Sequence, residues 1–216
     1  MYTRHFQTSS RFSRFSRPAG NSRFSGSRGR GRSMTGGNIH EFIRRANVKS
    51  TQVSPAQVVN EVLFSSLDLP ETLKATIARH GYVNLTPIQA QGIPAIRAGK
   101  DVIGIANTGT GKTAAFLIPL VENILKDFNY KALIISPTRE LALQTRDELR
   151  KFSGNMPIFS TLCIGQSSMQ MQVSQLRHNP HVVVGTPGRL KDLINRGVLK
   201  LGMFKMIILD ETDQML

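Results

Sequence analysis

The chain has 216 residues, which is enough for one domain with a tail but not for two full domains. Apolar residues make up 40% and charged residues 19%, as is ordinary for a chain that folds around a core, but the formal net charge of +14 is unusual. A membrane helix is excluded because no apolar run reaches roughly 18 residues, and a single cysteine, Cys163, excludes an internal disulfide and a multi-cysteine metal site. We therefore predict a protein of a reducing compartment, with a cytoplasmic location and no membrane partner.

The first 33 residues are basic and of low complexity. They contain eight arginines and no lysine, aspartate or glutamate, and they repeat Arg-Phe-Ser three times. No aliphatic pattern could bury a face, so we expect residues 1–33 to be a disordered tail. Arginine binds phosphates and phenylalanine stacks on bases, which favours RNA or another polyanion as partner over a purely solubilising role. Residues 34–60 are expected to be a polar linker, with a candidate short helix over 39–46.

From residue 61 onward, short apolar runs alternate with helical patterns. The strand candidates are rich in Val, Ile and Leu, which is typical of parallel strands covered on both faces; they span 101–106, 132–136, 158–165, 181–185 and 205–210. Helices are predicted over 71–80, 113–126, 138–152, 167–178 and 188–196. The alternation predicts an α/β fold over residues 61–216, with a doubly wound, mostly parallel sheet.

A glycine-rich loop follows the strand predicted over 101–106. It reads Ala106-Asn107-Thr108-Gly109-Thr110-Gly111-Lys112-Thr113 and leads into a predicted helix. The backbone N–H groups of such a loop, together with the helix N-terminus, bind phosphate oxygens. Lys112 would reach the β- and γ-phosphates, and the Thr113 hydroxyl would bind Mg²⁺. The strand–loop–helix context favours a nucleotide site over an incidental glycine-rich turn.

Two adjacent carboxylates, Asp210 and Glu211, follow the apolar run 206–209. At the carboxyl end of a parallel strand they would lie beside the phosphate loop. Asp210 would then hold Mg²⁺, partly through water, and Glu211 would orient or deprotonate an attacking water. The upstream loop favours this role over a solvated acidic turn, so Lys112, Asp210 and Glu211 are the candidate catalytic residues.

Taken in order, these motifs resemble those of the first RecA-like lobe of a DEAD-box RNA helicase, over about residues 60–216. Ala106 begins the phosphate loop as in that family, and Asp210-Glu211-Thr212-Asp213 resembles its acidic signature. Pro137-Thr138-Arg139-Glu140-Leu141-Ala142 and Thr186-Pro187-Gly188-Arg189 are similar to its two RNA-contact motifs in this lobe. Gly81-Tyr82 and Thr86-Pro87-Ile88-Gln89 look like its adenine-reading motif, and Phe64 has the position of its upstream aromatic residue.

The resemblance implies ATP and Mg²⁺ as ligands and RNA as a sequence-independent partner. The Gln89 amide complements the N7 acceptor and N6 donor of adenine, so it would select ATP over GTP, and Phe64 would stack on the ring. Without the resemblance, a core phenylalanine and a helix-surface glutamine would be the simpler interpretation. The expected ATP-binding residues are Phe64, Tyr82, Gln89, Thr108, Gly109, Thr110, Gly111, Lys112 and Thr113. The expected RNA-binding residues are Pro137, Thr138, Arg139, Gly165, Thr186, Pro187, Gly188 and Arg189.

Three features depart from the family pattern. Gln166 stands where the family has the second of two glycines that admit RNA, and Thr212 replaces an alanine beside the acids. The chain also ends at Leu216, before the family's Ser-Ala-Thr motif, the strand that bears it and the second RecA-like lobe. We therefore expect a partial sequence whose sheet is at least one strand short.

Two functions remain open at this point, with a different P-loop ATPase that acts on no nucleic acid as a distant third. The first is the ATP- and RNA-binding lobe of an ATP-dependent RNA helicase, which couples ATP hydrolysis to duplex unwinding or remodelling. In that case residues 1–216 alone should show negligible unwinding, because the family's arginine fingers come from the second lobe. The alternative is a non-catalytic RNA-binding or decoy protein with a residual nucleotide site.

Overall fold

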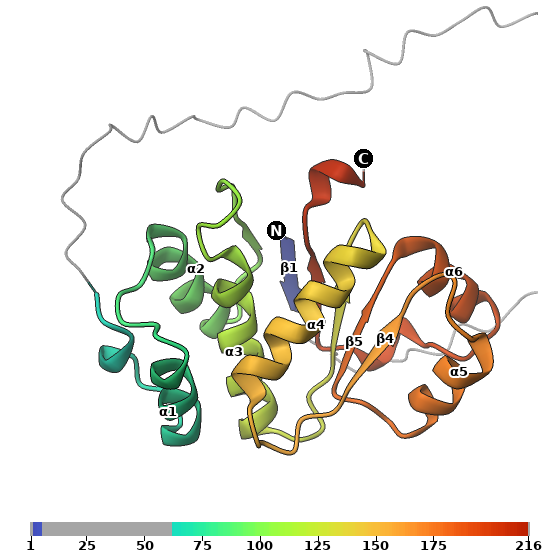
Figure 1. Ribbon diagram of the computed structural model, residues 1–216, viewed down its shortest axis with the longest axis horizontal. Helices are drawn as coiled ribbons and strands as arrows, with labels where there is room; N and C mark the ends of the chain where they lie inside the picture. The colour runs from blue at the N-terminus through green and yellow to red at the C-terminus, as the bar shows by residue number, and fades with distance from the viewer. Residues whose placement is uncertain (1, 6–61, 216) are drawn as a thin grey trace, which may run out of the picture. The chain divides into compact units, whose positions relative to one another are not determined.

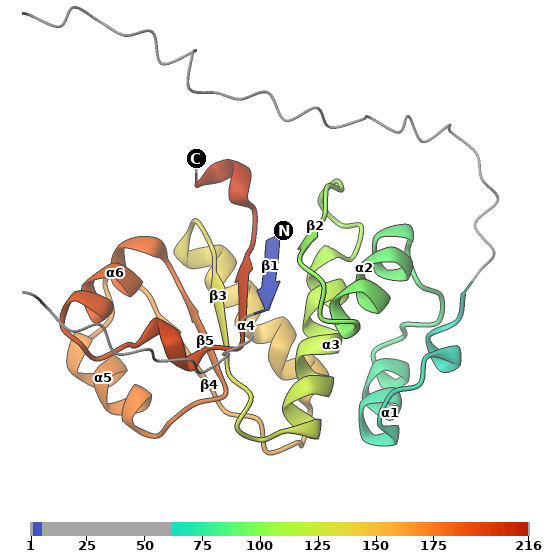
Figure 2. The same ribbon diagram turned by 180° about the vertical axis from the view of Figure 1, so that it is seen from behind.

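A six-stranded sheet forms the centre of the structure (Figures 1 and 2). The computed structural model describes residues 2–5 and 62–215, which belong to one unit, so the predicted linker and the candidate helix over 39–46 lie outside the described residues. The strands follow the order β2-β1-β6-β3-β5-β4. Their bounds are Tyr2–His5 (β1), Val102–Ile103 (β2), Ala132–Ile135 (β3), Ser160–Cys163 (β4), Val182–Gly185 (β5) and Met206–Leu209 (β6).

The four strands β6, β3, β5 and β4 pair in parallel, which confirms the predicted α/β fold with a mostly parallel sheet. Ala132 of β3 lies opposite Val182 on one side and Met206 on the other. Even-numbered residues of β3 thus pair with even-numbered residues of β5 and β6. Since side chains alternate between the two faces of a sheet, the even-numbered residues of these strands lie on one face. The central strands β3 and β5 are rich in Ala, Leu, Ile and Val because both of their faces are covered by helices, whereas β4 at the end of the sheet reads Ser-Thr-Leu-Cys and is only partly buried.

Helices cover the two faces separately. Their bounds are Glu71–Arg79 (α1), Pro87–Arg97 (α2), Lys112–Lys126 (α3), Arg139–Ser153 (α4), Met169–Arg177 (α5) and Pro187–Asn195 (α6), with 3₁₀ turns at Phe64–Ser66, Leu201–Met203 and Thr212–Gln214. One core joins α1 to α4 with Ile134, Val184 and Ile208 of the sheet. A smaller core joins α5 and α6 with Leu133 and Val183 on the opposite face. None of the helices in the described part of the chain has the length and apolarity to cross a membrane.

The helix α2 was not among the predicted helices. Its sequence contains Gly92 and Pro94, both poor residues for a helix interior. Pro87 at its first position starts the helix, and the fully buried Ile93 and Ile96 pack against the core. Burial of one face therefore outweighs the weak local propensity.

The strands β1 and β2 each correct one prediction, while residues 6–33 of the predicted tail lie outside the described residues. Residues 2–5 are not disordered but form a strand antiparallel to both β2 and β6, so the sheet has no open gap between them. The reason is that β2 and β6 each have unpaired backbone N–H and C=O groups along one edge. A short segment can form hydrogen bonds with these groups through its own backbone, regardless of its side chains. The expectation that the strand near 101–106 is a parallel strand covered on both faces is also wrong, because β2 pairs antiparallel with β1 and Ile103 is 72% exposed.

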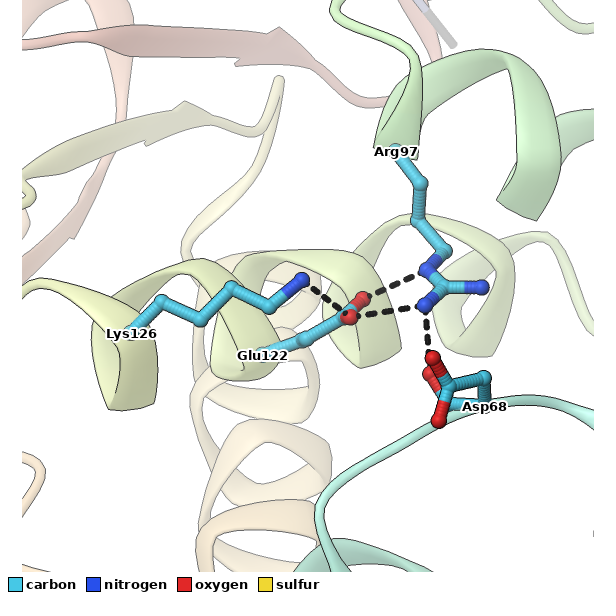
Figure 3. A network of polar contacts seen from close by, with 4 residues as sticks. All are labelled: Asp68, Arg97, Glu122 and Lys126. Atoms are coloured by element: carbon cyan, nitrogen blue, oxygen red, sulfur yellow. Dashed lines mark hydrogen bonds and ion pairs between the residues drawn. The ribbon is translucent and has the colours of Figure 1, made fainter.

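A buried carboxylate ties the helices beside the phosphate loop together (Figure 3). Glu122 of α3 is 1% exposed and accepts two hydrogen bonds from Arg97 of α2, at 2.8 and 2.9 Å, and one from Lys126 at 2.6 Å. Arg97 also donates to the backbone carbonyl of Asp68, ahead of α1. The buried carboxylate of Glu122 is thus paired with two cations. Its contact with Arg97 joins the C-terminal end of α2 to the C-terminal half of α3, away from the phosphate loop.

Candidate nucleotide and RNA sites

A pocket of about 500 Å³ opens at the carboxyl ends of the strands. It brings together eight of the predicted nucleotide and catalytic residues: Tyr82, Thr108, Gly109, Gly111, Lys112, Thr113, Asp210 and Glu211. The remaining lining residues are Ala114, Leu141, Gln144, Thr145 and Glu148. The phosphate loop and the acidic pair therefore face each other, although they are about a hundred residues apart in the chain.

The phosphate loop is closed on itself in this structure. The Lys112 Nζ donates to the carbonyl of Ala106, the first residue of the loop, at 2.7 Å. Thr110 Oγ1 donates to the Asn107 carbonyl, also at 2.7 Å. Gly109 and Gly111 have φ values of 79° and 85°, a region that glycine adopts without strain. A bound phosphate would have to replace the Ala106 carbonyl as the partner of Lys112.

Gln89 braces this loop from α2. Its Nε2 donates to the Gly111 carbonyl at 3.2 Å, and its Oε1 accepts from the backbone N–H of Thr86 at 2.9 Å. A Cβ on Gly111 would lie 2.2 Å from the Gln89 Nε2, so the close approach requires glycine. Gln89 is 1% exposed and does not line the pocket. Both ends of the amide that the sequence assigns to adenine are thus engaged within the protein.

Phe64 lies apart from the phosphate loop. Its ring is 3% exposed and packs edge-on against Tyr82, with 5.7 Å between ring centroids. Phe64 and Tyr82 line a separate pocket of about 460 Å³ between the turn at Phe64–Ser66 and α1. Tyr82 alone lines both pockets, so the structure brings Tyr82, but not Phe64, to the predicted ATP site.

Asp210 is buried at the end of β6, with 7% of the residue exposed. Burial raises the pKa of its carboxyl, and a hydrogen bond from Thr145 Oγ1 to Oδ2, at 3.3 Å, acts in the opposite direction. Glu211 follows in the left-handed region with φ 48°, an uncommon conformation for a residue with a side chain. Thr145 was not among the predicted site residues.

The donor set suits magnesium. The Thr113 hydroxyl and the carboxylates of Asp210 and Glu211 line one pocket, and all offer the hard oxygen atoms that Mg²⁺ prefers. No group of three or more His, Cys, Asp or Glu residues that could hold a metal occurs within 62–215. A Mg²⁺ ion bound with nucleotide phosphates needs only one or two protein carboxylates, so the small number of acids is compatible with it.

The predicted RNA-binding residues also converge. A pocket of about 510 Å³ is lined by Pro137, Thr138, Arg139, Gly165, Thr186, Gly188 and Arg189, which are seven of the eight predicted residues. Pro187 is exposed beside them. A second pocket of about 530 Å³ shares Thr138, Arg139 and Gly165 and extends to Gln166 and Ser167. The two pockets thus form one surface at the starts of α4 and α6.

Two of these residues have structural partners. Thr138 caps α4, accepting a hydrogen bond from the Leu141 N–H at 3.2 Å. Arg189 donates to Gln172 Oε1 at 2.8 Å and to the Ser167 carbonyl at 3.1 Å. Gln172 donates in turn to the Ile164 carbonyl at 2.9 Å, so Arg189 supports the loop 164–168. Gln172 was not among the predicted RNA-binding residues. The sequence feature that could have indicated its role is a glutamine on the apolar side of a helix.

The family departure at Gln166 has a clear backbone consequence. Gln166 has φ 58°, which is strained for a residue with a Cβ, whereas Gly165 before it does not have a positive φ. Thr212 is accommodated, since its hydroxyl donates to the Leu209 carbonyl at 3.3 Å.

The helix α4 joins the two sites. Thr138 and Arg139 at its start line the candidate RNA surface, while Leu141, Gln144, Thr145 and Glu148 line the candidate nucleotide pocket. These four have the i, i+3, i+4, i+7 spacing of one helical face. That spacing was the available sequence signal for their role. In Figure 1, α4 lies across the sheet between the α1–α3 side and the α5–α6 side.

Comparison with known proteins agrees with this geometry. The family model described as "DEAD/DEAH box helicase" matches residues 86–216. The chain is 48% identical over 154 residues to "ATP-dependent RNA helicase CshA" of Limosilactobacillus reuteri, covering 71% of this chain and 31% of that protein. It is 45% identical over 161 residues to "DEAD-box ATP-dependent RNA helicase CshA" of Bacillus subtilis, covering 72% and 32%. The chain thus spans about a third of the length of these curated relatives.

Solved structures show the same fold. A DEAD box protein from Methanococcus jannaschii superposes with a TM-score of 0.67 and 39% identity, covering 71% of this chain and 42% of that one. A hypothetical ATP-dependent RNA helicase from Sulfolobus tokodaii gives 0.63 and 37%, covering 68% and 43%. With the phosphate loop, the acidic pair and the RNA surface on one sheet edge, the chain belongs to the DEAD/DEAH box helicase family.

Proposed function

We propose that residues 62–215 form the ATP- and RNA-binding lobe of an ATP-dependent RNA helicase. The observation that carries this proposal is α4, whose start lines the RNA surface and whose next two turns line the phosphate-loop pocket. A rigid helix shared by both sites gives nucleotide and RNA a common element through which they are coupled. The full-length protein would use this coupling for duplex unwinding or remodelling.

In the nucleotide pocket, each residue has a definable task. Amides of Thr108 to Gly111 and the start of α3 would bind phosphate oxygens, and Lys112 would move from the Ala106 carbonyl to the phosphates. Thr113 and Asp210 would hold Mg²⁺, which neutralises phosphate charge when bound. Glu211 would orient or deprotonate the attacking water. Gln89 would read adenine after releasing Gly111 or Thr86, and Tyr82 with Phe64 behind it would form the base side of the pocket.

On the RNA surface, Arg139 supplies an exposed charge, and the starts of α4 and α6 supply backbone N–H groups for phosphates. Gly165 and Gly188 leave room for close approach, since a Cβ on either would meet no atom within 4 Å. Such contacts carry no base information, so binding would be independent of sequence. The basic tail would add non-specific affinity, and we propose a cytoplasmic location.

The pocket predicts slow hydrolysis by residues 1–216 alone. Lys112 is the only basic residue among the described residues that line it, so no arginine faces the γ-phosphate position. An arginine finger contributes on the order of 10³–10⁵ in rate where measured.

This prediction is tested by ATP hydrolysis and strand-release assays on purified 1–216 and on the same chain joined to a second RecA-like lobe. We expect RNA-stimulated hydrolysis and unwinding only from the joined protein, and loss of both in its Glu211→Gln variant. ATP-dependent unwinding by 1–216 that disappears in Glu211→Gln would contradict the proposed division of labour.

A further inference from the structure

The hydroxyl of Thr145 has an unusual hydrogen-bond acceptor for a threonine within a helix. A threonine hydroxyl within a helix commonly donates to the carbonyl four residues earlier. Thr76 of α1 does this, donating to the Thr72 carbonyl at 2.9 Å. Thr145 instead donates to Oδ2 of Asp210, 65 residues further along the chain, at 3.3 Å. Both threonines are buried, with 5% and 3% of the residue exposed, so solvent exposure does not explain the difference.

The environment of Asp210 explains why the contact matters. The carboxylate is largely buried, with 7% of the residue exposed, and lines the same pocket as Lys112 and Thr113. A second hydroxyl, that of Ser136, lies on the neighbouring strand's end and on the same face of the sheet. Ser136 is fully buried, and its Oγ has no hydrogen-bond partner among the described residues. Thr145 therefore supplies the side-chain hydrogen bond that orients Asp210, beside a backbone hydrogen bond at Glu211.

We propose that Thr145 is a positioning residue for Asp210. Its hydroxyl holds Oδ2 and thereby fixes the carboxylate toward the pocket before Mg²⁺ and nucleotide arrive. The restricted rotamers of a β-branched side chain on a helix make Thr145 a stiff support. Because α4 also begins at the RNA surface, the support for the metal-binding acid comes from the helix that contacts RNA.

This inference rests on the proposed nucleotide site, and its test separates the two. Affinity for a fluorescent adenosine diphosphate is measured in Mg²⁺ and in excess EDTA, on the full chain and its Thr145→Val, Thr145→Ser and Thr76→Val variants. Valine keeps the shape of threonine and removes the hydroxyl, whereas serine keeps the hydroxyl. Thr76→Val makes the same change in a buried helical threonine outside the pocket.

We expect Thr145→Val to reduce the ratio of EDTA to Mg²⁺ dissociation constants by about tenfold, the effect of losing a hydrogen bond to a charged group. Its affinity in EDTA should be unchanged, and Thr145→Ser and Thr76→Val should keep the ratio of the unmutated chain. An unchanged ratio in Thr145→Val, or an equal loss in Thr145→Ser, would overturn the positioning role alone. No Mg²⁺-dependent binding by the unmutated chain would overturn the nucleotide site, and this inference with it.

Discussion

The candidate nucleotide pocket and the candidate RNA surface lie on the same edge of the sheet, but they differ in how far their residues are buried and hydrogen-bonded within the protein. Lys112 and Asp210 in the nucleotide pocket, and Gln89 behind its phosphate loop, all have internal partners, and two of the three are buried. On the RNA surface, Thr138, Arg139 and Gly188 are exposed, and the capping bond of Thr138 leaves its helix start accessible. Nucleotide binding at the predicted site would therefore require rearrangement of existing hydrogen bonds, whereas Thr138, Arg139 and Gly188 are already accessible.

Each region also holds one strained residue. Glu211 in the nucleotide half and Gln166 in the RNA half both have positive φ values. Strain at Glu211 accompanies a chemical role that the proposed function assigns to its side chain. The proposed function assigns no such role to Gln166, which lines the edge of the candidate RNA surface. The following predictions test this contrast, from the largest expected effect to the smallest.

Lys112→Ala should reduce affinity for Mg²⁺-nucleotide by at least about a hundredfold, because the side chain is the only cation of the pocket within 62–215. RNA affinity should stay unchanged, since Lys112 does not line the RNA surface. Nucleotide titration and RNA binding are measured on the same preparation. Lys100→Ala, which removes an exposed lysine outside these pockets, is the control. A parallel loss of RNA binding would show that the two sites are not separate.

Gln89→Ala should reduce the preference for ATP over GTP by about tenfold, because the amide matches adenine and not guanine. Gln89→Glu is the sharper variant, since it keeps the acceptor for Thr86 N–H but cannot donate to Gly111 or to adenine. Gln91→Ala on the exposed side of α2 is the matched control. Competition of ATP and GTP against a fluorescent nucleotide gives the preference. Equal affinities in the unmutated chain would refute the adenine role of Gln89.

Arg139→Ala should weaken single-stranded RNA binding several-fold and reduce the slope of log affinity against log salt by about 0.7, the value for one phosphate contact. The loss should be the same for unrelated RNA sequences. Arg150→Ala, at the other end of α4, removes an equal charge away from both pockets and serves as control. A loss that depends on RNA sequence would mean that Arg139 reads bases.

Gln166→Gly should stabilise the fold by roughly 0.5–1 kcal/mol, because glycine adopts a positive φ without steric cost. Gln175→Gly, at an exposed position within α5, should destabilise it by about 1 kcal/mol. Denaturant unfolding measures both changes. If Gln166→Gly destabilised the fold as Gln175→Gly does, the left-handed conformation at 166 would be wrong.

The local pattern was sufficient for most of the elements. Alternating apolar runs and helical periodicity placed five of the strands and five of the helices within a few residues of their observed bounds. The prediction failed where the cause is not local. The helix α2 contains residues that oppose helix formation and is held by packing of Ile93 and Ile96. The strand β1 exists because β2 and β6 offer open edges to a segment about a hundred or more residues away.

The candidate sites divide in the same way. The sequence alone determined which residues carry charge, hydroxyls or backbone freedom, because a phosphate loop, a carboxylate pair and two helix starts with Thr and Pro are contiguous motifs. Tertiary structure decided which of them meet. It separated Phe64 from the phosphate loop, engaged Gln89 with Gly111, and placed Thr145 against Asp210. Such contacts depend on how helices pack across a sheet, and packing is set by the shapes of side chains distant in sequence.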